Sequence, residues 1–181
     1  MRFWLLTSTF YGNWLPGDER GFVGRVWENR PTDGTPGRRK EHDRSGEVFD
    51  AAIPGLKQAS ESLLGQQPVR IDIQHAECLL QQFRETAEYR NWSLLSVALM
   101  ANHVHWVVGM DESLHGSTAL QSFKSYGSRV LNQRFGIQPS GTWWTSKGSA
   151  RALLTDEAIR HAVEYVLQQE FPLLIWKADI R

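Results

Sequence analysis

The sequence predicts an α+β protein in which helices cover one face of a four-stranded antiparallel sheet. Three observations lead to this prediction. Four short segments are apolar and β-branched, as strands are, and three longer segments repeat apolar residues at helical spacing. The two kinds follow one another in the order strand, helix, strand, strand, helix, strand, helix. This is the order of a ferredoxin-like split βαβ fold with one further helix at its C-terminal end.

The predicted strands are apolar runs bounded by turn residues. They cover residues 2–10, 93–100, 103–110 and 149–154. The first strand runs into YGNWLPGDERG, whose Gly, Pro and Asp residues are typical of a turn. Only Ala101 and Asn102 separate the second strand from the third, so we expect a tight hairpin there.

The predicted helices are amphipathic. Residues 73–92 and 117–136 each carry an apolar stripe, and the second of these ends at Gly136, a residue favoured just after a helix. Residues 155–171 begin with Thr155 as an N-cap and two acidic residues in the first turn, which favours a helix start. We expect this last helix to pack against the sheet.

Length and composition predict one domain spanning residues 1–181, with a loop insertion at about residues 17–56, where Gly, Pro and charged residues show no period. Cys78 is the only cysteine, which excludes an internal disulfide and a cysteine-based zinc cluster. No apolar run reaches the roughly 20 residues of a membrane span. The first residues lack the features of a signal peptide. We therefore expect a cytoplasmic protein that does not enter a membrane.

The third predicted strand contains two histidines, one residue apart. Because side chains alternate along a strand, His103 and His105 point to one face while Val104 and Trp106 point to the other. Two imidazoles so placed are able to share one divalent cation. A His-x-His pair alone is a weak signal, and it needs a third ligand and a reactant.

The last predicted helix carries a polar row of His161, Tyr165 and Gln169, spaced four residues apart and therefore on one face. This row offers a tyrosine hydroxyl and a carboxamide oxygen. The alternative is a tyrosine that packs with its ring and exposes its hydroxyl to water. Tyr126 is the rival nucleophile, although it lies on the apolar stripe of its own helix and Val130, not an amide, follows one turn later.

The formal net charge is zero, but the basic residues are unevenly distributed. No acidic residue lies between Glu112 and Asp156, whereas this stretch contains Lys124, Arg129, Arg134, Lys147 and Arg151. The stretch predicts a positive face on a neutral protein, suited to phosphate backbones. Trp143 and Trp144 are candidates for stacking on unpaired bases, with burial in the core as the alternative.

Taken together, these pieces resemble the HUH single-tyrosine transposases, also called IS200-like transposases. The resemblance is carried by HVH in an apolar strand and by YVLQQ in the last helix. The segments STFYGNWLPGDERG, SFKSYGSRVLN and GTWW make the chain more similar to the REP-associated tyrosine transposase (RAYT) branch. The similarity runs from Phe3 to about Phe171, apart from the insertion. One departure is QQEFPLLIW, where many RAYT relatives have a segment of the kind Asn-Pro-Val.

The resemblance implies a role for each matching residue. His103, His105 and Gln169 would bind the metal, Mg²⁺ or Mn²⁺, and Tyr165 would be the nucleophile. His161 would orient the tyrosine or contact DNA.

The resemblance also implies an activity. It is the cleavage and rejoining of single-stranded DNA beside a hairpin through a 5′-phosphotyrosine intermediate. Two rivals remain, a domesticated DNA-binding module without catalysis and a metal-dependent nuclease without a covalent intermediate. Assembly as a monomer or as a homodimer with exchanged helices also stays open.

Overall fold

The structure is a computed structural model that describes residues 1–18, 25–28, 38–41 and 54–179. The chain divides into two compact units, one made of Met1–Asn13 and Gln66–Arg181 and the other of Trp14–Gly65. The first unit contains every candidate site residue named above. The second contains the predicted insertion at about residues 17–56.

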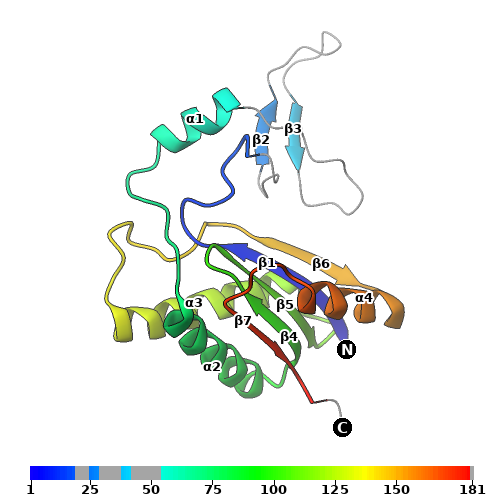
Figure 1. Cartoon of the computed structure of the whole chain (residues 1–181). Helices are drawn as coiled ribbons and strands as arrows, with labels where there is room; N and C mark the ends of the chain where they lie inside the picture. Colours follow the sequence, from blue (N-terminus) through cyan, green and yellow to red (C-terminus); the bar gives the residue numbers. More distant parts are fainter. Residues whose placement is uncertain (19–24, 29–37, 42–53, 180–181) are drawn as a thin grey trace. The chain divides into compact units, whose positions relative to one another are not determined.

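The first unit is built around an antiparallel five-stranded sheet. Its strands are β1 (Arg2–Thr9), β4 (Ser93–Leu99), β5 (His103–Met110), β6 (Ser149–Leu153) and β7 (Leu174–Lys177). Their order across the sheet is β6-β1-β5-β4-β7 (Figure 1). The first four strands have the split βαβ arrangement, so the predicted fold class is confirmed. The predicted hairpin between β4 and β5 is also present, closed by a hydrogen bond from Met100 N to His103 O of 2.9 Å.

The fifth strand, β7, was not predicted from the sequence. Its four residues, LIWK, are too short to show a period. They form a strand because β4 offers an unpaired edge, on which Leu174 pairs with Leu99 and Lys177 with Ser96.

Helices α2 (Ile73–Tyr89) and α3 (Gly116–Phe135) cover one face of the sheet. The core between them and the sheet is aromatic, with Phe83, Trp106 and Phe123 in mutual ring contact. Both helices begin at a side chain that caps a backbone N–H, Asp72 for α2 and His115 for α3. Within the described ranges, no helix is long and apolar enough to cross a bilayer.

Helix α4 (Asp156–Leu167) packs on the opposite face of the sheet (Figure 1). Its buried residues Ala162 and Val166 belong to a second, smaller apolar cluster that includes Ala98 and Val107 of the sheet. The sheet therefore has a thick core under α2 and α3 and a thin one under α4. The side chains of β5 that point away from the thick core point toward α4.

The second unit contains α1 (Pro54–Ser62) and a two-stranded antiparallel sheet of β2 (Arg25–Glu28) and β3 (Arg38–Glu41). The sequence predicts a loop insertion at about residues 17–56, whereas the structure has two short strands within that range, and α1 begins at its end. An ion pair between Lys57 and Asp18 (3.7 Å) links α1 to the start of the unit. Within the predicted insertion, residues 19–24, 29–37 and 42–53 lie outside the described residues.

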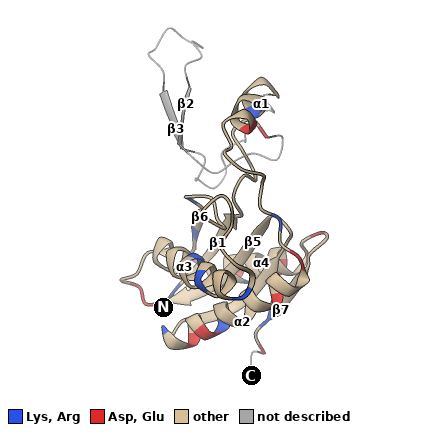
Figure 2. Cartoon of the chain, turned by 90° about the vertical axis from the view of Figure 1, so that its left-hand side faces the viewer, with Lys and Arg blue, Asp and Glu red and all other residues tan. Residues whose placement is uncertain are grey.

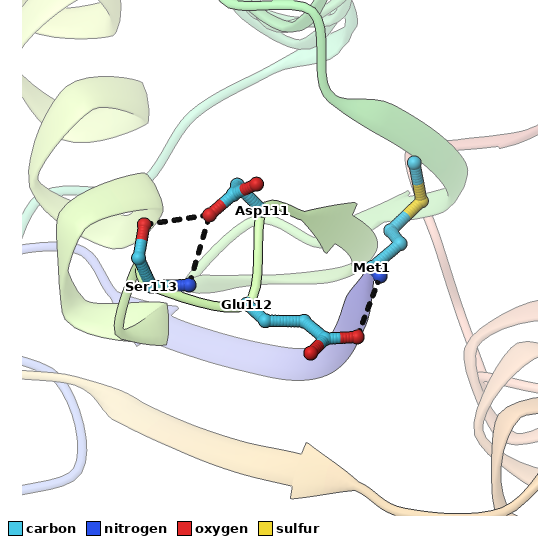
Figure 3. Close-up of polar contacts among 4 residues, drawn as sticks. All are labelled: Met1, Asp111, Glu112 and Ser113. Carbon is cyan, nitrogen blue, oxygen red and sulfur yellow. Dashed lines mark hydrogen bonds and ion pairs between the residues drawn. The ribbon is translucent and has the colours of Figure 1, made fainter.

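The turn from β5 into α3 is held by acidic side chains (Figure 3). Asp111 accepts hydrogen bonds from the backbone N–H (2.9 Å) and the hydroxyl (2.6 Å) of Ser113, and these bonds lower the pKa of its carboxyl. Glu112 accepts a hydrogen bond from the amino group of Met1 at 2.9 Å. The turn follows Met110, so these acids lie at the end of β5 farthest from its histidines.

Candidate active site

His103 and His105 lie side by side on the face of β5 that α4 covers. Their ring centroids are 4.9 Å apart, and the rings are almost perpendicular. The alternation of the strand places Val104 and Trp106 in the aromatic core on the other face. The structure thus pairs the two imidazoles as the sequence predicts.

The His105 imidazole is buried, with 3% of its surface exposed. Its Nδ1 is hydrogen-bonded to the Thr7 hydroxyl on β1 at 2.7 Å. Its Nε2 is buried and has no hydrogen-bond partner in the described part of the chain. Burial, and then the charge of His103, lower the pKa of His105 to about 3. The ring is therefore neutral at physiological pH, which is the form that binds a metal ion.

His103 is half-buried at the start of β5. Its Nδ1 is hydrogen-bonded to the side-chain oxygen of Asn102 at 2.6 Å. Asn102 belongs to the tight turn between β4 and β5. Each histidine therefore has its Nδ1 next to an oxygen of a neighbouring side chain.

Helix α4 brings Tyr165 to the histidines. Thr155 caps the start of the helix by accepting a hydrogen bond from Ala158 N at 3.1 Å. The burial of Val166 holds the last turn of the helix against the sheet. Tyr165 is 48% exposed, and its ring lies edge-on to His105 with the centroids 5.3 Å apart. The structure thus joins the predicted nucleophile to the predicted metal-binding pair within one chain.

Gln169 and His161 are the other two residues of the predicted polar row. Helix α4 ends at Leu167, so the prediction of a helix to residue 171 is wrong, and Gln169 follows the helix instead of lying on it. The Gln169 amide nitrogen donates to the backbone oxygen of Tyr165 at 3.0 Å, which keeps the side chain next to the tyrosine. His161 is exposed on α4, one turn before Tyr165.

A divalent cation fits the donor set at this site. The buried Nε2 of His105 has no partner among the described residues, and a metal ion is a partner that such a nitrogen accepts. His103 supplies a second imidazole, and the amide oxygen of Gln169 is a third candidate ligand. No group of three His, Cys, Asp or Glu residues is suited to a metal within the described ranges. A cation here would therefore take its remaining ligands from the substrate or water.

Tyr126, the rival nucleophile, lies on α3 and therefore on the far side of the sheet from His105. It is half-buried, and the guanidinium of Arg129 lies 5.4 Å from the centre of its ring. The sheet itself separates Tyr126 from the two histidines. This placement favours Tyr165 as the nucleophile.

Lys124, a predicted DNA contact, is engaged within the protein. Its ammonium donates hydrogen bonds to the backbone oxygens of Thr145 (2.5 Å) and Lys147 (3.1 Å). Burial lowers the pKa of Lys124 to about 8. The side chain holds the segment before β6 against α3, so in this conformation its charge is directed at the protein and not at a ligand.

This lysine predicts a pH dependence of stability. Between pH 8 and about 10.5 the unfolded chain binds more protons at Lys124 than the folded one, so its contribution to folding becomes more favourable as the pH rises. The free energy of unfolding of the wild type should therefore increase with pH relative to Lys124→Met across this window. Urea denaturation at several pH values measures the difference, and parallel curves would contradict the prediction.

Trp143 and Trp144 correct a second expectation. They are 2% and 3% exposed, so neither presents a ring face to a base. Trp144 stacks on Phe10 with the ring centroids 4.5 Å apart, and the Trp143 indole donates to Asn132 at 2.7 Å. Both rings are therefore part of the core, which is the alternative that the sequence left open.

The other basic candidates are exposed but lie on two different faces. Arg129 and Arg134 project from α3, on which Figure 2 shows basic and no acidic residues, whereas α2 carries both kinds. Arg151 is the pairing partner of Leu5, a residue of the α4 face, so it shares that face with His105. Lys147 lies in the loop before β6. A single continuous basic face is therefore not formed by these residues.

Sequence reasoning did not find Thr7 and Asn102. Asn102 directly precedes His103, so the sequence shows that the two residues are neighbours. Asparagine is common in turns, however, and its presence there does not indicate a contact with the imidazole. Thr7 meets His105 only through the pairing of β1 with β5. No spacing along the chain indicates that contact.

Comparison with known proteins places the chain in a family. Residues 67–169, more than half of the chain, match the family model of the IS200-like transposases. A search of curated proteins finds no match.

Two solved structures are similar to this one. One is a REP-associated tyrosine transposase bound to a REP hairpin, with 11% identity, a TM-score of 0.47, and coverage of 91% of this chain and 64% of that chain. The present chain thus spans less than two thirds of that protein. The other is assigned as a transposase from Deinococcus radiodurans R1, with 14% identity, a TM-score of 0.45, and coverage of 94% and 91%. On the match to the family model, the chain belongs to the IS200-like transposase family.

Proposed function

We propose that this chain is a metal-dependent single-tyrosine transposase of the REP-associated kind. It cleaves and rejoins hairpin-flanked single-stranded DNA through a 5′-phosphotyrosine intermediate. The observation that carries the proposal is the contact between the Tyr165 and His105 rings, beside a buried imidazole nitrogen that lacks a partner among the described residues. The proposed nucleophile and the proposed metal-binding pair are thus adjacent in a chain that belongs to a transposase family.

In this proposal the two histidines of β5 and the Gln169 amide are the residues that bind the metal ion. His103, His105 and Gln169 would hold Mg²⁺ or Mn²⁺, and a cation bound there would supply polarisation of the scissile phosphate and neutralisation of the charge on its oxygens. A phenol is a weak nucleophile at neutral pH, so the reaction depends on accurate placement of the tyrosine oxygen. Packing of Val166 against the sheet supplies this placement, because it holds the adjacent turn of α4.

The covalent step conserves the phosphodiester energy. The Tyr165 oxygen bonds to the phosphorus, the bond from phosphorus to the 3′-oxygen breaks, and the leaving strand ends in a 3′-hydroxyl. A second 3′-hydroxyl then attacks the phosphotyrosine and releases the tyrosine. Both steps exchange one phosphate ester for another, so strands are joined without ATP. His161, one turn from Tyr165, orients the tyrosine or contacts the DNA.

Among the predicted basic DNA contacts, Arg151 is the best placed to meet the DNA backbone near the reaction, because it lies on the same face of the sheet as His105. The exposed Arg129, Arg134 and Lys147 contact backbone farther from the scissile phosphate. Because α4 packs Tyr165 against the histidines of its own chain, we propose that a monomer carries out this chemistry.

Labelled oligonucleotides test the proposal directly. Hairpin-flanked single strands, drawn from the flanks of the gene, are incubated with the protein and Mg²⁺ or Mn²⁺ and resolved on a denaturing gel. A 5′-phosphotyrosine predicts that the 3′-label migrates with the protein, whereas the 5′-label appears on a shortened free strand. Cleavage without an adduct would indicate a nuclease, and binding without cleavage would indicate a DNA-binding module.

A further inference from the structure

We propose that Thr7 and Asn102 are positioning residues that hold His105 and His103 in the Nδ1–H tautomer, so that both Nε2 atoms keep a lone pair for the cation. The inference rests on the proposed metal site and deepens it. It concerns two residues that contact neither the substrate nor the metal in this proposal. They act through the imidazoles.

Asn102 determines the tautomer of His103 by simple chemistry. A carboxamide oxygen accepts hydrogen bonds and cannot donate them. In the amide orientation of this structure the side-chain oxygen of Asn102 lies 2.6 Å from His103 Nδ1, and with this orientation Nδ1 carries the proton. In a neutral imidazole the lone pair then belongs to Nε2.

The Thr7 hydroxyl has the same effect on His105 when it accepts the hydrogen bond. The hydroxyl oxygen lies 2.7 Å from His105 Nδ1 and is able either to donate or to accept. Acceptance leaves the lone pair on Nε2, the atom that is buried without a partner among the described residues. A metal ion satisfies a lone pair at this nitrogen but not an N–H, so the tautomer in which Thr7 accepts is the one that is able to bind the cation.

The backbone keeps both oxygens in place. Thr7 lies within β1, where it pairs with His105 on one side and Ser149 on the other. The backbone oxygen of Asn102 accepts a hydrogen bond of 2.9 Å from Phe10 N. The backbone that carries the side-chain oxygens of Thr7 and Asn102 is therefore hydrogen-bonded within the sheet and its turn, as is usual for groups that orient metal ligands.

The chain offers a matched control in Thr9. It lies two residues from Thr7 on the same face of β1 and is buried, whereas Thr7 is half-buried. Its hydroxyl is hydrogen-bonded to the Thr145 hydroxyl at 3.0 Å and its Cα partner is His103. Thr9→Val therefore removes a β1 hydroxyl without removing the contact with His105 Nδ1.

The test uses metal-free protein labelled with ¹⁵N in its histidines. At neutral pH the ¹⁵N chemical shifts report the tautomer of each imidazole, and a Mn²⁺ titration followed by electron paramagnetic resonance gives the affinity. We expect Thr7→Val to convert His105 to a mixture of tautomers and to raise the Mn²⁺ dissociation constant about 10- to 100-fold. Thr7→Ser and Thr9→Val should resemble the wild type.

Asn102 is tested in the same way. Asn102→Ala should mix the tautomers of His103 and weaken Mn²⁺ binding by a similar factor, whereas Asn102→Asp retains an acceptor oxygen and should preserve the Nδ1–H form. A wild-type His105 found as Nε2–H, a wild type that binds no Mn²⁺, or unchanged affinity in Thr7→Val and Asn102→Ala would overturn the inference.

The two proposals fail in distinguishable ways. If tautomers and Mn²⁺ affinity respond as expected but no DNA adduct forms, the strand-transfer function is wrong and the positioning roles stand. If the adduct forms while Thr7→Val and Asn102→Ala bind Mn²⁺ like the wild type, the positioning roles are wrong and the function stands.

Discussion

Replacing Tyr165 by phenylalanine is expected to abolish the covalent protein–DNA adduct. The substitution removes only the hydroxyl, so the ring should keep its edge-on contact with His105, and α4 should keep its packing through Ala162 and Val166. Metal binding and DNA binding should therefore remain close to wild type. The adduct and the free 3′-hydroxyl strand should both fall below detection, because the variant has no oxygen at this position to attack the phosphorus.

Tyr126→Phe is the control for this prediction. It removes the same hydroxyl from the residue that the sequence offers as a rival, but on the far side of the sheet, so the adduct should form as in the wild type. An adduct that persists in Tyr165→Phe and disappears in Tyr126→Phe would contradict the assignment. Cleavage that survives in Tyr165→Phe would instead indicate water as the nucleophile.

Loss of either histidine should weaken metal binding and slow the metal-dependent reaction. His103→Ala and His105→Ala each delete one imidazole from the donor set, and ligand loss should reduce Mn²⁺ affinity and the rate of cleavage by at least about 100-fold. The double variant should show no metal-stimulated cleavage. The rate of strand cleavage as a function of Mn²⁺ concentration measures this effect, with circular dichroism to confirm folding.

His115→Ala controls for the loss of a histidine elsewhere. His115 is exposed at the start of α3 and stands against Trp4 with a centroid distance of 4.7 Å. Its removal weakens a helix cap and should leave the Mn²⁺ dependence of cleavage unchanged. Equal losses in His115→Ala and His105→Ala would mean that the effect comes from stability and not from the metal site.

The sequence was sufficient for those parts of the fold whose signal is local. Apolar, β-branched runs located four strands and helical spacing of apolar residues located three helices of the first unit, and the alternation of side chains along β5 put His103 and His105 on one face. Capping residues marked the start of α4 at Thr155. The reason is that these features depend on neighbours within a few residues along the chain.

The sequence could not predict what a side chain meets across space. Trp143 and Trp144 are as suitable for bases as for a core, and only the packing of Phe10 and Asn132 against them decided for the core. Lys124 is a residue type that often contacts phosphate, yet its ammonium donates hydrogen bonds to two backbone oxygens of the protein. The strand β7 exists because β4 has a free edge.

The candidate site shows the same division. The sequence by itself determined that two imidazoles share a face and that a tyrosine lies on a later helix, because both follow from the repeat of a strand and of a helix. Only the tertiary structure decided that α4 covers the histidine face, that Tyr165 meets His105, and that Thr7 binds the same ring. These contacts join residues far apart in the chain, and they arise from strand pairing and from the burial of apolar surface between helix and sheet.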